Sequence, residues 1–241
     1  MDNFILYIIC LVLVEPGPGL FLAGAKLSVC WTVRMTGVLM ILAMAVFIVG
    51  TANFYNFMDG INGIAAITGI VGFGLLALYS FLSESYSSFA VLSVCIYFSC
   101  LGFLPFNMPK AKVFMGDVGS ILLGFTFAGM VVWLSKNPLD FICLAAFLFP
   151  FYADELTTMA VRIRDGENLL RAHRRHLYQV LANEKGVSQW KVSLGYGILQ
   201  LSVGVSILLF KDMGSIVVIS MLAIYFGAFA GMGFAVRRKL E

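Results

Sequence analysis

Residues 35–63 read MTGVLMILAMAVFIVGTANFYNFMDGING, and the sequence changes within them from an apolar run to a polar segment. This alternation of apolar spans and polar segments determines the architecture of the chain. Met35–Ala52 is apolar and long enough for a helix across a bilayer, which needs about 17 to 25 residues. Polar residues follow at intervals of three, namely Asn53, Asn56 and Asp59, which keeps them near one face of a helix. Such a face favours a polar ligand at the membrane surface, although a helix end followed by capping residues explains the same spacing.

The composition indicates that the whole chain is built of apolar spans. Of the 241 residues, 61% are hydrophobic and only 12% are charged, against about 25% in an ordinary soluble domain. The mean hydropathy is +0.95, so we expect an all-α, polytopic membrane helical bundle of seven full spans plus one partial N-terminal span. The full spans are expected at Met35–Ala52, Ile64–Leu82, Ser88–Phe106, Val118–Ser135, Leu139–Ala153, Val192–Phe210 and Met213–Val236.

The partial span is Phe4–Val14, an apolar run of 11 residues that Glu15 and Pro16 end. It is too short to cross the core as a helix, and it lacks the basic n-region and the small-residue cleavage site of a secretory signal. We therefore interpret residues 1–241 as one integral-membrane domain that lacks its N-terminal spans. Residues 154–191, the long hydrophilic stretch, are expected to form a basic cytoplasmic loop within this domain.

The distribution of basic residues predicts the orientation. If the spans alternate, 12 of the 16 Lys and Arg residues fall on one side, which makes that side cytoplasmic. The twelve are Lys110, Lys112, Arg162, Arg164, Arg171, Arg174, Arg175, Lys185, Lys191, Arg237, Arg238 and Lys239, and the other four are Lys26, Arg34, Lys136 and Lys211. The polar segments that interrupt the apolar chain all fall on this cytoplasmic side.

Asp117 stands directly before the expected span Val118–Ser135. A carboxylate at this place can cap the free amides of the first helical turn. The other interpretation is a magnesium ligand, because Mg²⁺ prefers oxygen donors and takes one or two carboxylates together with substrate phosphates. Upstream, the segment Phe106-Asn107-Met108-Pro109 predicts a rigid turn, and Lys112 adds charge that attracts phosphate.

The two histidines of the chain, His173 and His176, stand one helical turn apart among Arg171, Arg174 and Arg175. Two histidines without a nearby cysteine are too few for a zinc site. A basic cluster of this kind fits a lipid-headgroup surface. It also fits an anion clamp, in which arginines make forked contacts to a diphosphate and a histidine orients it or moves a proton.

Taken in order, these segments resemble a known family. The set Asn53-x-x-Asn56-x-x-Asp59-Gly60-x-x-Gly63, Phe114-Met115-Gly116-Asp117-x-Gly119-Ser120 and His173-x-x-His176 is similar to that of the polyprenyl-phosphate N-acetylhexosamine-1-phosphate transferases. The resemblance runs over about residues 1–200. The region from His173 to Gln179 looks most like members that begin O-antigen or capsule repeat units, because it lacks the three-histidine cluster of the peptidoglycan enzyme.

The resemblance implies a magnesium-dependent enzyme, with Mn²⁺ as an alternative metal, in the inner membrane of a bacterium with its active site facing the cytoplasm. It would transfer N-acetylhexosamine 1-phosphate from a UDP-N-acetylhexosamine to undecaprenyl phosphate, giving a lipid-linked diphosphate sugar and UMP. Its expected partners are these two substrates and membrane lipids, with a homodimer as an option and no nucleic acid. Phosphoryl transfer needs mainly positioning and neutralisation of charge, which these residue types can provide.

The resemblance also implies roles for individual residues. The expected catalytic residues are Asp59, Asp117, His173 and His176, and the expected metal ligands are Asp117 and Asn56. Substrate contacts are expected from Asn53, Asn56, Asn62, Asn107, Lys112, Arg171, Arg174 and Arg175.

The chain departs from the family at two places. Members usually carry an adjacent aspartate pair upstream of the helix that here begins near Phe4, and this chain has only Asp2-Asn3 there. Asn62 stands where members often have an acidic residue, and an amide can hydrogen-bond a substrate but cannot act as a base. Two alternatives therefore stand beside the enzyme: an inactive fragment or scaffold derived from it, and a multi-pass lipid or solute transporter. A transporter predicts ionisable residues deep within its spans, and these spans carry almost none.

Overall fold

The computed structural model describes residues 23–83, 87–168 and 174–238. Every regular element within these ranges is helical and none is a strand, which confirms the expected all-α class. The predictions for Phe4–Val14, Arg171 and His173 lie outside the described residues.

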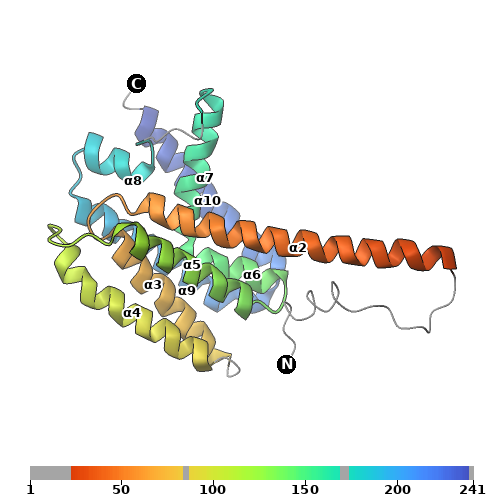
Figure 1. The fold of residues 1–241 in the computed structure, drawn as a ribbon. Coiled ribbons are helices and arrows are strands. Elements are labelled where there is room, and N and C mark those ends of the chain that lie inside the picture. The colour runs from red at the N-terminus through yellow and green to blue at the C-terminus, as the bar shows by residue number, and fades with distance from the viewer. Residues whose placement is uncertain (1–22, 84–86, 169–173, 239–241) are drawn as a thin grey trace.

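Figure 1 shows the helices and their order along the chain. In order, they are α2 (Ala23–Met58), α3 (Ile64–Leu82), α4 (Ser87–Asn107), α5 (Gly116–Leu134), α6 (Pro138–Ala145), the 3₁₀ turn η1 (Ala146–Leu148), α7 (Phe149–Arg164), α8 (Leu177–Gln179), the π-helical turn η2 (Val180–Glu184), α9 (Gln189–Phe210), the 3₁₀ turn η3 (Lys211–Met213) and α10 (Ser215–Arg238).

Six helices of the described part are long and apolar enough to cross a membrane. They are Met35–Met58, Ile64–Leu82, Ser88–Asn107, Gly116–Leu134, Gln189–Met213 and Ser215–Arg238. These six correspond to six of the seven full spans expected from the sequence.

The seventh expected span, Leu139–Ala153, is not a single helix. α6 starts at Pro138, where the Asn137 side chain accepts the backbone N–H of Asp140 at 2.9 Å as an N-cap. The chain then passes through η1 into α7, whose first turn contains Pro150. Proline has no N–H to donate to the preceding turn and its ring crowds that turn, so an uninterrupted helix is disfavoured here. The count of seven full spans is therefore not confirmed.

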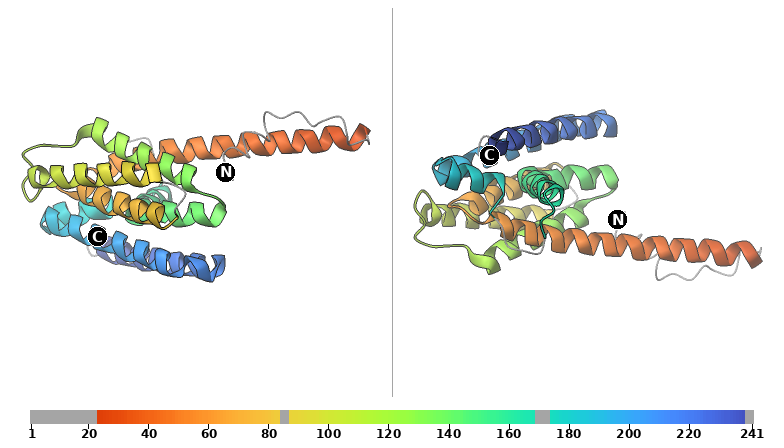
Figure 2. Two further views of the ribbon diagram at one scale, coloured as in Figure 1. Left: turned by 90° about the horizontal axis from the view of Figure 1, so that it is seen from below. Right: turned by 90° about the horizontal axis from the view of Figure 1, so that it is seen from above.

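The hydrophilic stretch 154–191, which we expected to be a basic cytoplasmic loop, contains several helical elements. α7 continues to Arg164, so its first part is helical. α8 and η2 follow as short helical turns, and α9 already begins at Gln189. These elements lie beside the end of α10 at one end of the bundle, as Figure 2 shows from two sides.

α3 is the most deeply buried of the six apolar helices. It packs against α4 on one side and α9 on another, while α2 packs against α5. A buried amide joins three of these elements, because Gln200 Nε2 of α9 donates to the carbonyl oxygens of Thr68 in α3, at 3.1 Å, and of Phe147 in η1, at 2.7 Å. Few alternative partners exist in a lipid environment, so these hydrogen bonds help to fix the register of α9 against α3.

The contact between α2 and α5 is close because Gly124 faces α2. A Cβ atom added to Gly124 would lie 2.7 Å from Tyr55 Cβ, 2.8 Å from Ala52 Cα and 2.9 Å from the carbonyl oxygen of Thr51. Two of these atoms belong to the backbone, so a rotamer change cannot make room. Glycine at such a contact lets two helix backbones approach, as in other membrane bundles.

Gly124→Ala is therefore expected to lower the melting temperature of the detergent-solubilised protein by several degrees, since overpacking usually costs about 1–3 kcal/mol. Gly129→Ala on the same helix is the matched control, because an added Cβ there meets no atom of the described part of the chain within 4 Å. Fluorescence-detected thermal unfolding measures both variants. Equal melting temperatures would contradict the close contact.

Candidate functional site

Four residues from the end of α2 and the start of α5 form what we call the carboxylate cluster: Asn56, Asp59, Asp117 and Ser120. The Ser120 hydroxyl donates to Asn56 Oδ1 at 2.6 Å, which ties the two helices together. Asp59 directly follows α2, and Asp117 lies in the first turn of α5. Burial, with a smaller contribution from the Asp117 carboxylate, raises the pKa of Asp59 to about 6. The structure therefore brings together three of the residues expected from the sequence.

The structure does not use Asp117 as a helix cap. The N-cap position of α5 is Met115, and no side chain makes a capping hydrogen bond there. Asp117 is exposed in the first turn, where the free backbone amides of the helix favour a negative charge. Its carboxylate is thus available at the surface of the cluster for a ligand.

The chemistry of the carboxylate cluster fits a magnesium ion. Asp59 and Asp117 offer carboxylate oxygens, and the carbonyl oxygen of Asn56 keeps a second lone pair beside its hydrogen bond to Ser120. Among the described residues, no group of three or more His, Cys, Asp and Glu side chains could hold a metal. Mg²⁺ needs no such cage, because it keeps several waters and shares substrate phosphates with one or two carboxylates.

The turn after Asp59 is held by residues that we expected to contact substrate. Gly63 has a φ of 86°, a left-handed conformation, and its N–H donates to Asn107 Oδ1 at 2.6 Å. The other end of this amide, Asn107 Nδ2, donates to the carbonyl oxygen of Val113 at 2.9 Å. Asn62 Nδ2 donates to the carbonyl oxygen of Pro109 at 3.2 Å. Both asparagines therefore join the turn to the α4–α5 connection, and their contact with substrate stays a prediction.

Three other predicted substrate-binding residues are exposed. Asn53 Nδ2 donates back to the carbonyl oxygen of Val49 in its own helix, at 2.9 Å. Lys112 lies on the α4–α5 connection, and Arg174 precedes α8. Their contact with substrate also stays a prediction.

His176 is buried beside two carboxylates of α7. Its Nδ1 lies 3.9 Å from Asp154 Oδ1, and its Nε2 lies 3.5 Å from Glu155 Oε2. The imidazole also stacks on the ring of Tyr178, with centroids 5.6 Å apart. We call Asp154, Glu155, His176 and Tyr178 the histidine cluster. The imidazole is therefore enclosed by the two carboxylates of α7 and the Tyr178 ring.

Glu155 has the most perturbed carboxyl group in this cluster. Burial, followed by the charge of Asp154, raises its pKa to about 7, and Arg162 opposes this shift. Glu155 is 4% exposed and its Oε2 makes no hydrogen bond with the residues that the structure describes. Near neutral pH it therefore exchanges readily between a neutral and a charged form.

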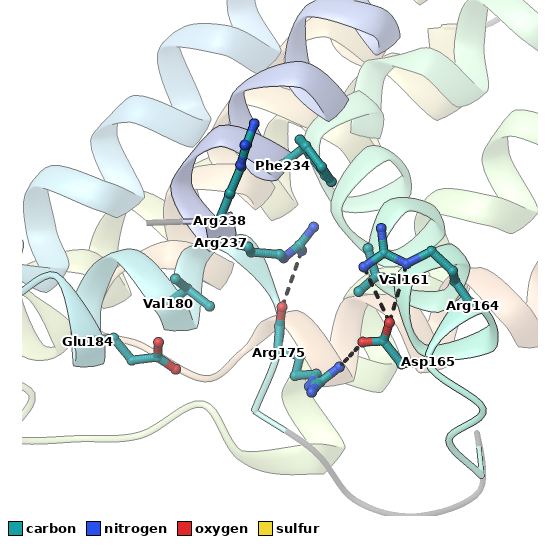
Figure 3. Close-up of a pocket in the computed structure, with 9 residues that line it drawn as sticks. All are labelled: Val161, Arg164, Asp165, Arg175, Val180, Glu184, Phe234, Arg237 and Arg238. Carbon is teal, nitrogen blue, oxygen red and sulfur yellow. Dashed lines mark hydrogen bonds and ion pairs between the residues drawn. The ribbon is translucent and has the colours of Figure 1, made fainter. Parts of the chain in front are cut away.

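A basic pocket of about 330 Å³ adjoins the histidine cluster (Figure 3). It lies between the C-terminal ends of α7 and α10, the segment before α8, and η2. Four arginines and two carboxylates line it, so its net charge favours an anion. The lining residues are Val161, Arg164, Asp165, Arg175, Val180, Glu184, Phe234, Arg237 and Arg238.

Arg175 is the predicted substrate contact that lines this pocket. Its guanidinium lies 2.6 Å from Asp165 Oδ2 and 3.0 Å from Glu167 Oε1. Hydrogen bonds from Arg175 and Arg164 hold the pKa of Asp165 below its usual range. In Figure 3 the Arg175 side chain points toward Asp165, while its carbonyl oxygen accepts a hydrogen bond from Arg237. Binding a diphosphate through Arg175 would therefore compete with these ion pairs.

The sequence profile of glycosyl transferase family 4 matches residues 3–135, more than half of the chain. This chain belongs to glycosyl transferase family 4. The match includes the whole carboxylate cluster and ends before the histidine cluster. Membership agrees with the family that the sequence motifs resemble.

Two groups of curated relatives share part of the chain. A phospho-N-acetylmuramoyl-pentapeptide-transferase of Staphylococcus saprophyticus is 34% identical over 128 residues, which are 50% of this chain and 38% of the relative. A decaprenyl-phosphate N-acetylglucosaminephosphotransferase of Mycobacterium leprae is 36% identical over 106 residues, which are 38% of this chain and 27% of the relative. The chain thus spans well under two thirds of these relatives.

Several residues of the two clusters were not singled out from the sequence. Asp154 and Glu155 stand at the end of the apolar run Leu139–Ala153, and we expected them to begin a solvated loop. In the structure both are buried within α7. The sequence did offer one indication of a helix here, because the acidic pair lies within a stretch compatible with a helix that continues to Arg164. Ser120 and Tyr178 belong to the quoted motifs, but no pattern predicted their partners.

Glu155→Gln is expected to flatten the dependence of stability on pH. The pKa of Glu155 rises from 4.5 in the unfolded chain to about 7 in the fold, so its contribution to stability is complete below pH 4.5 and is lost as the pH rises through 7. In the wild type, this loss should lower the melting temperature as the pH rises. Glutamine stays neutral, so the melting temperature of the variant should fall less and should be higher than that of the wild type above pH 7. Thermal unfolding between pH 4.5 and 8 measures the slope.

The exposed Glu184 provides the control for this experiment. Glu184→Gln makes the same chemical change at an exposed position, so a flatter slope in Glu155→Gln alone would assign the effect to the buried Glu155. An unchanged slope in Glu155→Gln would contradict the assignment of the raised pKa to Glu155.

Proposed function

We propose that the protein transfers N-acetylhexosamine 1-phosphate from a UDP-sugar to undecaprenyl phosphate. A phosphate oxygen of the lipid attacks the sugar-linked phosphorus of the UDP-sugar, and the bond from this phosphorus to the bridging oxygen breaks. The products are a lipid-linked diphosphate sugar and UMP, which leaves with the bridging oxygen. The observation that carries the proposal is the Asn56–Ser120 hydrogen bond, which joins the end of α2, just before Asp59, to the first turns of α5, which carry Asp117.

The chain's own residues supply positioning and charge in this reaction. Asp59, Asp117 and Asn56 would hold Mg²⁺, or Mn²⁺ in its place, which when bound neutralises charge on the diphosphate oxygens. The hydrogen bonds of Asn62 and Asn107 keep the Asp59 turn in place. The arginines beside His176, together with His173, would hold the uridine diphosphate, while His176 itself is buried between Asp154 and Glu155.

The membrane arrangement agrees with the two kinds of substrate. The carboxylate cluster lies at the end of α2 and the start of α5, and His176 directly precedes α8, so a water-soluble nucleotide sugar could meet a lipid phosphate there. The excess of Lys and Arg on this side favours the cytoplasmic face of the bacterial inner membrane. The absence of a three-histidine cluster favours initiation of an O-antigen, capsule or related polysaccharide over peptidoglycan synthesis.

An assay for UMP tests the proposal directly. Membranes from cells that express the complete coding sequence are incubated with undecaprenyl phosphate, MgCl₂ and a panel of UDP-N-acetylhexosamines. UMP released only when lipid phosphate and one of these sugars are both present supports the transferase. No UMP with any sugar would contradict it and would leave a scaffold or a transporter.

Asp117→Asn is expected to reduce UMP release by at least about 100-fold, because it removes charge from the metal site, with an effect on the scale of other charge-stabilising groups. The melting temperature should stay within about 2 °C, since Asp117 is exposed and caps no helix. Asp212→Asn, an exposed carboxylate in η3 at the other end of α9, serves as the control and should keep full activity. Activity retained in Asp117→Asn would remove Asp117 from the catalytic site.

A further inference from the structure

One side chain connects the two clusters. The Tyr178 hydroxyl donates to the carbonyl oxygen of Phe57 at 2.9 Å, across 121 positions of sequence. Phe57 lies in the last turn of α2, two residues before Asp59. The Tyr178 ring also fits against Gly60, where any added Cβ would overlap the hydroxyl. The segment that carries His176 thus rests directly on the turn that carries Asp59.

The other end of Tyr178 is fixed by a buried carboxylate. Asp154 Oδ1 accepts the N–H of Leu177 at 2.8 Å, and Asp154 Oδ2 accepts the N–H of Tyr178 at 3.3 Å. Asp154 is fully buried, and it also accepts hydrogen bonds from the hydroxyls of Thr158, at 3.1 Å, and Tyr196, at 2.7 Å. A buried carboxylate with this many donors holds its partners in one geometry.

Arg237 of α10 holds the residue just before His176. Its Nη2 donates to the carbonyl oxygen of Arg175 at 3.2 Å and to the Thr158 hydroxyl at 2.9 Å. The same nitrogen lies 3.7 Å from Asp154 Oδ1. The segment from Arg175 to Tyr178 is therefore fixed from α7, α9 and α10, while the Tyr178 hydroxyl reaches α2.

We propose that Asp154 and Tyr178 are positioning residues that set the distance between the diphosphate-holding histidine segment and the metal-holding Asp59 turn. This inference rests on the proposed transferase function. Neither residue needs to touch substrate. Asp154 fixes the backbone of the segment, and the Tyr178 hydroxyl transmits that position to Phe57, next to the carboxylate cluster. Phosphoryl transfer is sensitive to such alignment, because the attacking and leaving oxygens must lie in line.

Tyr178→Phe isolates this connection. It removes the hydrogen bond to Phe57 but keeps the ring that stacks on His176 and packs on Gly60. With the wild-type protein active in the UMP assay, the variant is expected to lose about 10-fold in kcat, while the KM for the UDP-sugar changes less than about threefold. A raised KM with unchanged kcat, or no change in either, would overturn the proposal.

Tyr225→Phe is the matched control, because its hydroxyl also joins two helices through a hydrogen bond, to Ser206 at 3.0 Å. It lies between α9 and α10, outside both clusters, so its kinetic constants should equal those of the wild type. A loss of kcat in Tyr225→Phe as large as that in Tyr178→Phe would show a general effect of helix contacts and would overturn the positioning role.

Amide hydrogen exchange separates this inference from the proposed function. In Tyr178→Phe, exchange should accelerate in residues 57–63, and in Asp154→Asn it should accelerate in residues 174–182 as well, whether or not the protein releases UMP. Absence of UMP from the wild type would contradict the transferase, while the exchange data still test the connection. Unchanged exchange in residues 57–63 of Tyr178→Phe would overturn the connection itself.

A suppressor pair tests the contact from its other side. Gly60→Ala should reduce activity more than Tyr178→Phe does, because its Cβ meets the Tyr178 hydroxyl and also crowds the ring, and Tyr178→Phe in the same chain should restore activity part of the way to that of Tyr178→Phe alone. Restoration is expected to be partial, since the ring carbons Cε2 and Cζ would still lie 3.1 Å from the new Cβ. A double variant less active than Gly60→Ala alone would contradict the contact.

Discussion

The close approach of α2 to α5 is the constraint on which the carboxylate cluster depends. Gly124 leaves no side chain between the two helices, so α5 lies directly against the backbone of Thr51 and Ala52. About one turn along each helix, the same packing brings Ser120 within 2.6 Å of Asn56. A metal site assembled from two helices keeps its geometry only when its supporting contacts are rigid. The close packing at Gly124, within the apolar region, therefore helps to determine how Asn56 and Ser120 lie relative to each other at the helix ends.

The spans could be predicted because apolarity is a local property of the sequence. α3, α4, α5, α9 and α10 begin and end within a few residues of their expected bounds. The segment Leu139–Ala153 was predicted less well, since average hydropathy does not register the break that Pro150 introduces. Hydropathy also falls as α7 becomes amphipathic, which is why its second half was expected to be a loop. A helix that is half buried and half polar is hard to predict from hydropathy alone, because its burial depends on the helices that pack against it.

The candidate site was predictable to the extent that its residues are adjacent in sequence. The spacing of Asn56 and Asp59 and the position of Asp117 before a span pointed to the carboxylate cluster. Asp154 and Tyr178 gain their roles from partners far away in the chain, such as Phe57, and no local pattern encodes those contacts. Asn107 was expected to contact substrate from the family resemblance, and nothing in the sequence indicated that both ends of its amide also hold the turn after Asp59.

α2 carries Asn56 of the carboxylate cluster, and α10 carries Arg237, which donates a hydrogen bond to the carbonyl oxygen of Arg175 just before His176. Large apolar side chains are exposed along α2, such as Val46, and along α10, such as Ile216 and Ile224. Transmembrane helices respond to a thicker or thinner hydrocarbon layer by changing their tilt. Tilt of α2 or α10 would move Asp59 and Arg237 with the helix ends that carry them. A change in the acyl-chain length of the surrounding bilayer would thus shift the charged groups of the candidate site, through the helices that hold them.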